Sequence, residues 1–166
     1  VTVTYNNTAG ILTAYINGGE NTYTSSSGTT LPSQSFGNIL QIGRGATNVN
    51  TAYFNGEISN FQVFNTALPA TGSNSVETLY NNGSPLTSMS GFTSLQGWWK
   101  LDASATYDGS NWTIPDDSTN SNDGTSSGMT QANLVQSDLS FTTGYSPYAL
   151  DFDSASSDAI NCGNDS

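Results

Sequence analysis

Four side chains that carry oxygen donors alternate along a polar segment in the second half of the chain. They are Asp116, Ser118, Asn120 and Asn122. Hard cations such as Ca²⁺ take several carboxylate, hydroxyl and amide oxygens as ligands, so this alternation predicts a metal site with calcium as the candidate cofactor. The same residue types also form Asx turns, in which side chains bond to the backbone of their own loop, and the spacing fits both interpretations. The segment is not an EF-hand loop, because Ser121 and Ser127 stand where that loop needs Gly and Glu.

Aromatic side chains in the same turn-rich region form a second candidate site. They are Tyr107, Trp112, Tyr145 and Tyr148. Sugars stack on aromatic faces and bond to nearby polar groups, so these residues predict a carbohydrate-binding platform. The alternative is that their rings close the edge of the hydrophobic core. The adjacent Trp98 and Trp99 point to opposite faces of a strand, which predicts one ring in the core and one partly exposed.

Residue content excludes two kinds of catalytic chemistry. The chain has no His, which excludes a Ser-His-Asp triad and any His-based zinc site. The single cysteine, Cys162, cannot form an internal disulfide and has no His to activate it. We therefore expect Cys162 to be a small buried apolar side chain.

Glycoside hydrolysis needs only two carboxylates that flank one bond, about 5–9.5 Å apart. The glutamates Glu20, Glu57 and Glu77 fall on separate predicted elements, so they do not build such a pair. Asp151 and Asp153 share a strand face, but beside a loop they more easily serve solvation or a cation. The sequence therefore predicts that the protein is not an enzyme.

The charge balance limits the partners. Only Arg44 and Lys100 are basic, against 13 acidic residues, and the formal net charge is −11. Binding of nucleic acids and of anionic membrane surfaces needs basic residues, so we expect neither as a partner. No apolar run is long enough for a membrane-spanning helix, so membrane insertion is not expected either.

Short strands joined by turns are the predicted framework for these sites. Apolar residues in alternating or continuous runs predict strands at residues 1–5, 11–16, 38–43, 56–64, 98–101, 148–153 and 158–162. The first two strands predict an antiparallel hairpin, and Asn17-Gly18 predicts the tight turn that follows it. Apolar residues on one face predict a single short helix over residues 73–82. Residues 102–147 show little periodicity and many turn formers.

The order of these motifs resembles a known family. Five motifs in the first half of the chain resemble the second half of a laminin-G-like (concanavalin A-like) jelly roll. They are the strand at 1–5, the Tyr-x-Asn-Gly hairpin at 12–18, the Ile-Gly pair at 42–43, the Gly-x-Ile strand at 56–58 and the helix residues at 79–80. Three later motifs resemble the opening of the same domain type. They are the Trp-x-Leu-Asp strand at 99–102, the polar loop at 116–125 and the Ala-Leu-x-Phe-Asp strand at 149–153. The chain departs from the family pattern at Ser59, where the family has Asp, and at Thr119 and Ser121, where it has Gly.

The resemblance implies an all-β fold, an antiparallel β-sandwich of the jelly-roll type that is permuted or incomplete. It implies the C-terminal half of one laminin-G-like domain at residues 1–83, a linker at 84–96 and the N-terminal part of a second such domain at 97–166, as in tandem repeats. Because open strand edges invite pairing, we expect the two parts to pair with each other or with other copies. Jelly rolls of this family often hold calcium at a loop like 116–125.

The function that the resemblance implies is non-catalytic. It is the binding of glycans, such as cell-surface polysaccharide, or of a surface, or a structural role in a larger extracellular or virion protein. The Asn- and Thr-rich style is similar to that of repetitive phage structural or fibre proteins, and a first residue of Val fits a fragment of metagenomic origin. The alternative is a domain related to glycoside hydrolases of concanavalin A-like fold.

Overall fold

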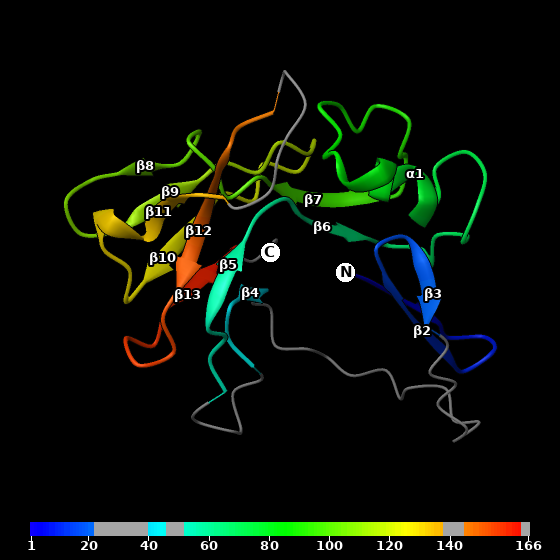
Figure 1. The fold of residues 1–166 in the computed structure, drawn as a ribbon, viewed down its shortest axis with the longest axis horizontal. Helices are drawn as coiled ribbons and strands as arrows, with labels where there is room; N and C mark the ends of the chain where they lie inside the picture. Colours follow the sequence, from blue (N-terminus) through cyan, green and yellow to red (C-terminus); the bar gives the residue numbers. More distant parts are fainter. Residues whose placement is uncertain (22–39, 46–51, 138–144, 164–166) are drawn as a thin grey trace. The chain divides into compact units, whose positions relative to one another are not determined.

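The computed structural model of the protein describes residues 1–21, 40–45, 52–137 and 145–163. Its strands are short and antiparallel, and α1 (Val76–Tyr80) is the one α-helix of the described residues (Figure 1). The predicted all-β sandwich with one short helix is therefore confirmed. Across the described ranges, no helix is long and apolar enough to cross a membrane.

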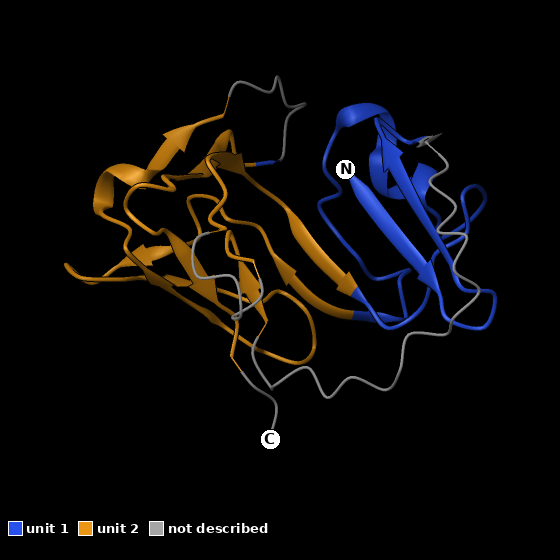
Figure 2. Ribbon diagram, turned by 90° about the horizontal axis from the view of Figure 1, so that it is seen from below, with its two compact units in different colours: residues 1–35, 64–95, 142–145 blue, residues 36–63, 96–141, 146–166 orange. Residues whose placement is uncertain are grey.

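The described residues form two compact units (Figure 2). Unit 1 holds residues 1–21, 64–95 and Tyr145, and unit 2 holds residues 40–45, 52–63, 96–137 and 146–163. Unit 2 thus combines segments from both sides of the predicted linker at 84–96. The division into 1–83, 84–96 and 97–166 stays a prediction about the repeats of the larger protein.

Unit 1 contains a three-stranded antiparallel sheet in the order β1-β2-β3. Its strands are β1 (Thr2–Asn6), β2 (Ile11–Ile16) and β3 (Gly19–Asn21). The two strands pair antiparallel, with Val3 opposite Ala14, which confirms the predicted hairpin. Asn17 and Gly18 both have positive φ, 52° and 73°, which is the conformation that an Asn-Gly turn supplies between β2 and β3.

The helix of unit 1 is shorter than predicted. It begins after Ser75, whose side chain accepts a hydrogen bond from the Thr78 amide at 3.1 Å. It ends at Tyr80 because Asn81 and Asn82 adopt left-handed conformations, with φ of 43° and 54°, and form a 3₁₀ turn with the next residue. Tyr80 lies against the β2–β3 turn: a Cβ on Gly18 would lie 2.5 Å from its ring, so only glycine fits there.

Unit 2 contains two antiparallel sheets. The larger has the order β4 (Gln41–Ile42), β13 (Ala159–Asn161), β10 (Gly124–Ser127), β9 (Trp112–Ile114), β8 (Thr106–Tyr107). The smaller has the order β11 (Leu134–Gln136), β12 (Tyr148–Phe152), β5 (Gly56–Ile58), and a 3₁₀ turn, Gln131–Asn133, precedes β11. A further pair is made by β6 (Phe61–Phe64) and β7 (Leu95–Trp99).

Both sheets of unit 2 join early and late segments of the chain. Ile58 on β5 pairs with Leu150 on β12, and Ile42 on β4 pairs with Ile160 on β13. The predicted strand at 56–64 is two strands, because Asn60 takes a positive φ of 56° between β5 and β6. Four strands of residues 102–147 were not predicted, since two to four residues are too few to show a period.

The hydrophobic core of unit 2 is built mainly from these strands and from the residues after β7. Its buried members are Ile42, Trp99, Leu101, Ala105, Trp112, Ile114, Met129, Leu150, Phe152, Ile160 and Cys162. Trp99 is a core residue, as predicted for one of the two adjacent tryptophans. Trp98 is not partly exposed, as predicted for the other, but only 4% exposed. The Lys100 ammonium lies 4.7 Å from its ring centre, and Asn60 Oδ1 accepts the indole hydrogen bond at 2.7 Å.

Candidate functional site

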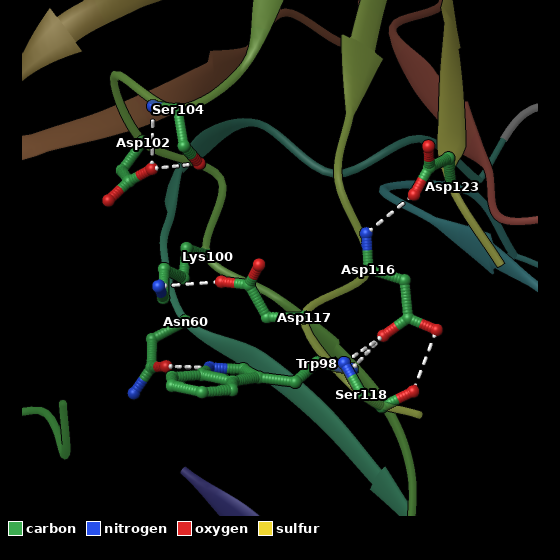
Figure 3. A network of polar contacts seen from close by, with 9 residues as sticks. All are labelled: Asn60, Trp98, Lys100, Asp102, Ser104, Asp116, Asp117, Ser118 and Asp123. Carbon is green, nitrogen blue, oxygen red and sulfur yellow. Dashed lines mark hydrogen bonds and ion pairs between the residues drawn. The ribbon is translucent and has the colours of Figure 1, made fainter. Parts of the chain in front are cut away.

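The predicted calcium loop is organised around one buried carboxylate, that of Asp116, which follows β9 (Figure 3). Its Oδ1 accepts hydrogen bonds from the amides of Trp98 at 2.8 Å and Ser118 at 2.9 Å. Its Oδ2 accepts from Ser118 Oγ at 2.8 Å and from the Asn122 amide at 3.0 Å. The carboxylate thus ties strand β7 to the loop and closes the loop on itself.

The ends of the loop are joined by a second carboxylate. The Asp116 amide donates to Asp123 Oδ1 at 2.9 Å. The carbonyl of Asn122 accepts the indole hydrogen bond of the core residue Trp99 at 2.8 Å. The loop is therefore anchored to the core of unit 2 as well as to itself.

The remaining predicted ligands also bond within the protein. Asn120 Nδ2 donates to the carbonyl of Gln96 at 2.7 Å, and Ser118 Oγ lies 3.3 Å from the same oxygen. All four predicted residues are thus brought together at one loop. The bond from the Ser118 backbone amide to Asp116 is that of the Asx-turn alternative, in which a side chain satisfies the backbone, and Asn122 bonds through its own backbone amide and carbonyl.

This arrangement does not fit a calcium ion well. Each oxygen of Asp116 already accepts two hydrogen bonds, and the N–H groups that point at it would repel a cation. Within the part of the chain that the structure describes, no three Asp, Glu, Cys or His side chains converge as metal ligands. Calcium stays a prediction of the sequence.

A chelator tests the two interpretations of the loop. Because the carboxylate is satisfied by its own protein, we expect EDTA or millimolar CaCl₂ to shift the melting temperature by less than about 1 °C. The measurement is a thermal melt followed by tryptophan fluorescence. A clear rise in melting temperature with CaCl₂ that EDTA reverses would instead establish a calcium site.

Sequence reasoning missed the neighbours of this loop (Figure 3). Lys100 Nζ lies 2.6 Å from Asp117 Oδ2, on the partly exposed side of the network. The buried Asp102 accepts hydrogen bonds from the amide and hydroxyl of Ser104 at 2.9 and 2.6 Å, a local Asx turn. The Asp-x-Ser spacing, which Asp116 and Ser118 share, is the sequence signal that could have found this turn.

A further buried carboxylate lies at the turn between β12 and β13. Asp158 is 0% exposed, and its Oδ2 accepts from Asn133 Nδ2 at 2.8 Å and from the Asp153 amide at 2.9 Å. No hydrogen bond reaches its Oδ1 from the described residues. Gly128 packs directly against that oxygen: a Cβ on Gly128 would lie 2.8 Å from it. No local sequence pattern predicts this contact, because it depends on tertiary packing.

The predicted aromatic platform is only partly assembled. The Trp112 ring is 4% exposed and belongs to the core, and its indole donates to the Thr130 carbonyl at 2.8 Å. The half-buried Tyr107 ring packs on it, with ring centres 5.2 Å apart. These two positions agree with the core-edge alternative. Tyr148, 39% exposed, begins β12 in the other sheet, and the half-buried Tyr145 belongs to unit 1. A platform of all four residues stays a prediction.

Cys162 is a buried core side chain, 2% exposed, as the sequence predicts. Burial, and to a smaller extent the negative charge of Asp116, raise the pKa of its thiol from 9.0 to about 12. Because the thiolate is the reactive form, the folded protein holds this cysteine in an inert state.

We expect Cys162 to resist a thiol reagent at pH 8 until the protein unfolds. Labelling should be slow in buffer and complete in urea, as measured by the absorbance of released thionitrobenzoate. The folded thiol binds its proton more tightly than the unfolded one, so its contribution to stability is full below pH 9 and is lost as the pH rises toward 12. Rapid labelling in buffer would contradict the burial.

Unit 1 contains a surface cavity beside the loop that follows β6. Its volume is about 490 Å³, and its lining includes Asn65, Thr66, Leu68, Ser73, Phe92 and Thr93. The described residues that line it are all uncharged. This cavity was not predicted, because its polar residues are of types that are common throughout the chain.

The described residues thus define an all-β sandwich protein with a neutral surface cavity and buried carboxylates that serve hydrogen bonds. Residues 1–72 match the family model described as the concanavalin A-like lectin/glucanases superfamily, so the predicted resemblance is confirmed over this segment. The resemblance of residues 97–166 stays a prediction. Comparisons with curated proteins and with solved structures gave no match.

Proposed function

We propose that the protein is a non-catalytic carbohydrate-binding module of a larger extracellular or virion protein. The observation that carries this proposal is the match of residues 1–72 to a superfamily that includes lectins. A β-sandwich in this superfamily offers loops and faces on which neutral polar groups can meet a glycan. The net charge of −11 also favours partners without negative charge.

The environment of three carboxylates, those of Asp116, Asp117 and Asp158, supports a structural role for them rather than a part in hydrolysis. A glycosidase needs one carboxyl group as an acid and a second as a base or nucleophile, both facing the substrate. Asp116 and Asp158 are buried and occupied by backbone and side-chain donors, and Asp117 is paired with Lys100. None of these three groups is placed to transfer a proton to a bound glycan.

Glycan binding and turnover, measured on the same protein, test the proposal. We expect saturable binding to at least one neutral polysaccharide in an immobilised panel and no release of reducing ends from it over a day. Release of reducing ends would favour the alternative, a domain related to glycoside hydrolases. Failure to bind every glycan of the panel would contradict a carbohydrate-binding role.

Self-association is a further part of the proposal. Strand β1 is an edge of its sheet, its residue Val3 is 59% exposed, and Val1, which precedes the strand, is 98% exposed. The glycan measurements should therefore be accompanied by light scattering, so that the number of binding sites is counted per chain.

A further inference from the structure

We infer that the cavity of unit 1 is the carbohydrate site of this module and that it takes an uncharged sugar residue. The inference rests on the proposed function and adds to it a location and a ligand class. The volume of about 490 Å³ lies within the range of small-molecule sites, about 300–1,000 Å³. The cavity is distinct from the aromatic residues that the sequence singles out.

The cavity has an apolar base. Leu68 and Phe92 line it and are 7% and 6% exposed. The Phe92 ring packs against the Phe64 ring, with the ring centres 5.6 Å apart. A sugar presents C–H groups on one face of its ring, and such a face packs favourably against a small apolar surface.

The walls of the cavity are held by backbone hydrogen bonds. The backbone amide of Asn65 donates to the Ser94 carbonyl at 3.0 Å, and this bond joins two lining segments that are distant in the sequence. The Val76 amide donates to the Pro69 carbonyl at 3.0 Å, which fixes the loop to the start of α1. The site is therefore formed before a ligand arrives, and little ordering is needed on binding.

The rim of the cavity carries exposed polar side chains that make no hydrogen bonds to other described residues. Asn65, Thr66, Ser73 and Thr93 are exposed, and their side chains take part in no hydrogen bond with the described residues. Nearby Ser75 and Thr78 differ, because their hydroxyls donate to the Gly72 carbonyl at 2.7 and 2.8 Å. Amides and hydroxyls both donate and accept, as recognition of sugar hydroxyls requires.

The charge around the cavity selects among sugars. The only basic residues of the chain, Arg44 and Lys100, both belong to unit 2. Unit 1 therefore contributes no Lys or Arg side chain that could pair with a carboxylate or sulfate group of an acidic glycan. An acidic sugar would lose water from its charge without a compensating partner, so neutral sugars are favoured.

Two substitutions on the rim test the site. We expect Asn65→Ala and Thr93→Val each to weaken binding of a neutral polysaccharide about tenfold, because each removes a protein side-chain group that would hydrogen-bond to the ligand. The matched controls are Asn7→Ala and Thr8→Val, which remove the same groups from the exposed β1–β2 turn of unit 1 and should leave affinity unchanged. All four variants should melt within a few degrees of the wild type, since none removes a buried contact.

The probes are dextran, mannan and galactan as neutral polysaccharides, with alginate and chondroitin sulfate as acidic ones, measured by calorimetry. Neutral binding that the two rim variants weaken and the controls do not would support the inference. Unchanged affinity in both rim variants would overturn the cavity as the site while leaving the module's function intact. Equal or tighter binding of the acidic probes would overturn the ligand class. A wild-type protein that binds none of the probes would overturn the proposed function itself.

Discussion

Replacing Asp116 with alanine is expected to lower the free energy of unfolding of unit 2 by about 3–5 kcal/mol. The substitution removes the acceptor of four hydrogen bonds and leaves the amides of Trp98, Ser118 and Asn122 without their partner. The loop would lose its tie to β7, and the Asn122 carbonyl that accepts from the core residue Trp99 would move with it.

Urea unfolding followed by tryptophan fluorescence measures this change selectively. All three tryptophans, Trp98, Trp99 and Trp112, belong to unit 2, so the signal reports that unit. The matched control is the adjacent Asp117→Ala, which removes an ion pair at a partly exposed position and should cost less than about 1 kcal/mol. Equal losses of unfolding free energy in the two variants would show that the buried Asp116 network stabilises unit 2 no more than the Asp117 ion pair does.

Replacing Gly128 with alanine is expected to lower the free energy of unfolding by about 2–5 kcal/mol. The new Cβ would lie 2.7 Å from the Ser156 carbonyl oxygen and 2.8 Å from Asp158 Oδ1, closer than such atoms approach. Gly128 also has a φ of +82°, which alanine adopts only with strain. The turn that holds the buried Asp158 would have to move away.

Gly109→Ala separates the two causes. Gly109 also has a positive φ, +102°, but a Cβ there would meet nothing within 4 Å. This control should therefore show only the backbone cost of about 1–2 kcal/mol, measured by the same urea titration. If both alanine variants lose the same stability, the contact with the Asp158 turn contributes nothing.

Local signals in the sequence predicted the elements that local chemistry controls. The alternation in residues 1–5 and 11–16 and the Asn17-Gly18 pair are sufficient for the hairpin and its turn. The alternation of oxygen-bearing side chains from Asp116 onward correctly located a loop with a hydrogen-bonded network. It could not show whether the oxygens of that loop bond to a cation or to the backbone. That choice depends on strand β7, whose Trp98 amide comes from 18 residues earlier.

Features that depend on tertiary packing could not be predicted. The alternation rule assigned one of Trp98 and Trp99 to a partly exposed face, yet Lys100 and Asn60 cover Trp98. The cavity of unit 1 depends on segments around Asn65 and Phe92 that meet only in the folded chain. Strands of two to four residues, such as β8, are held by their neighbours in the sheet and leave no period to detect.

The pairing of β5 with β12 and of β4 with β13 has a consequence for how the protein folds. Partner residues in these pairs are about 90 residues or more apart, so unit 2 closes long loops before its sheets gain their contacts, and its folding should be slow. During synthesis, β4 and β5 leave the ribosome well before their partner strands β13 and β12 exist. Their unpaired edges must then remain free of other chains for several seconds, a period in which aggregation competes with folding.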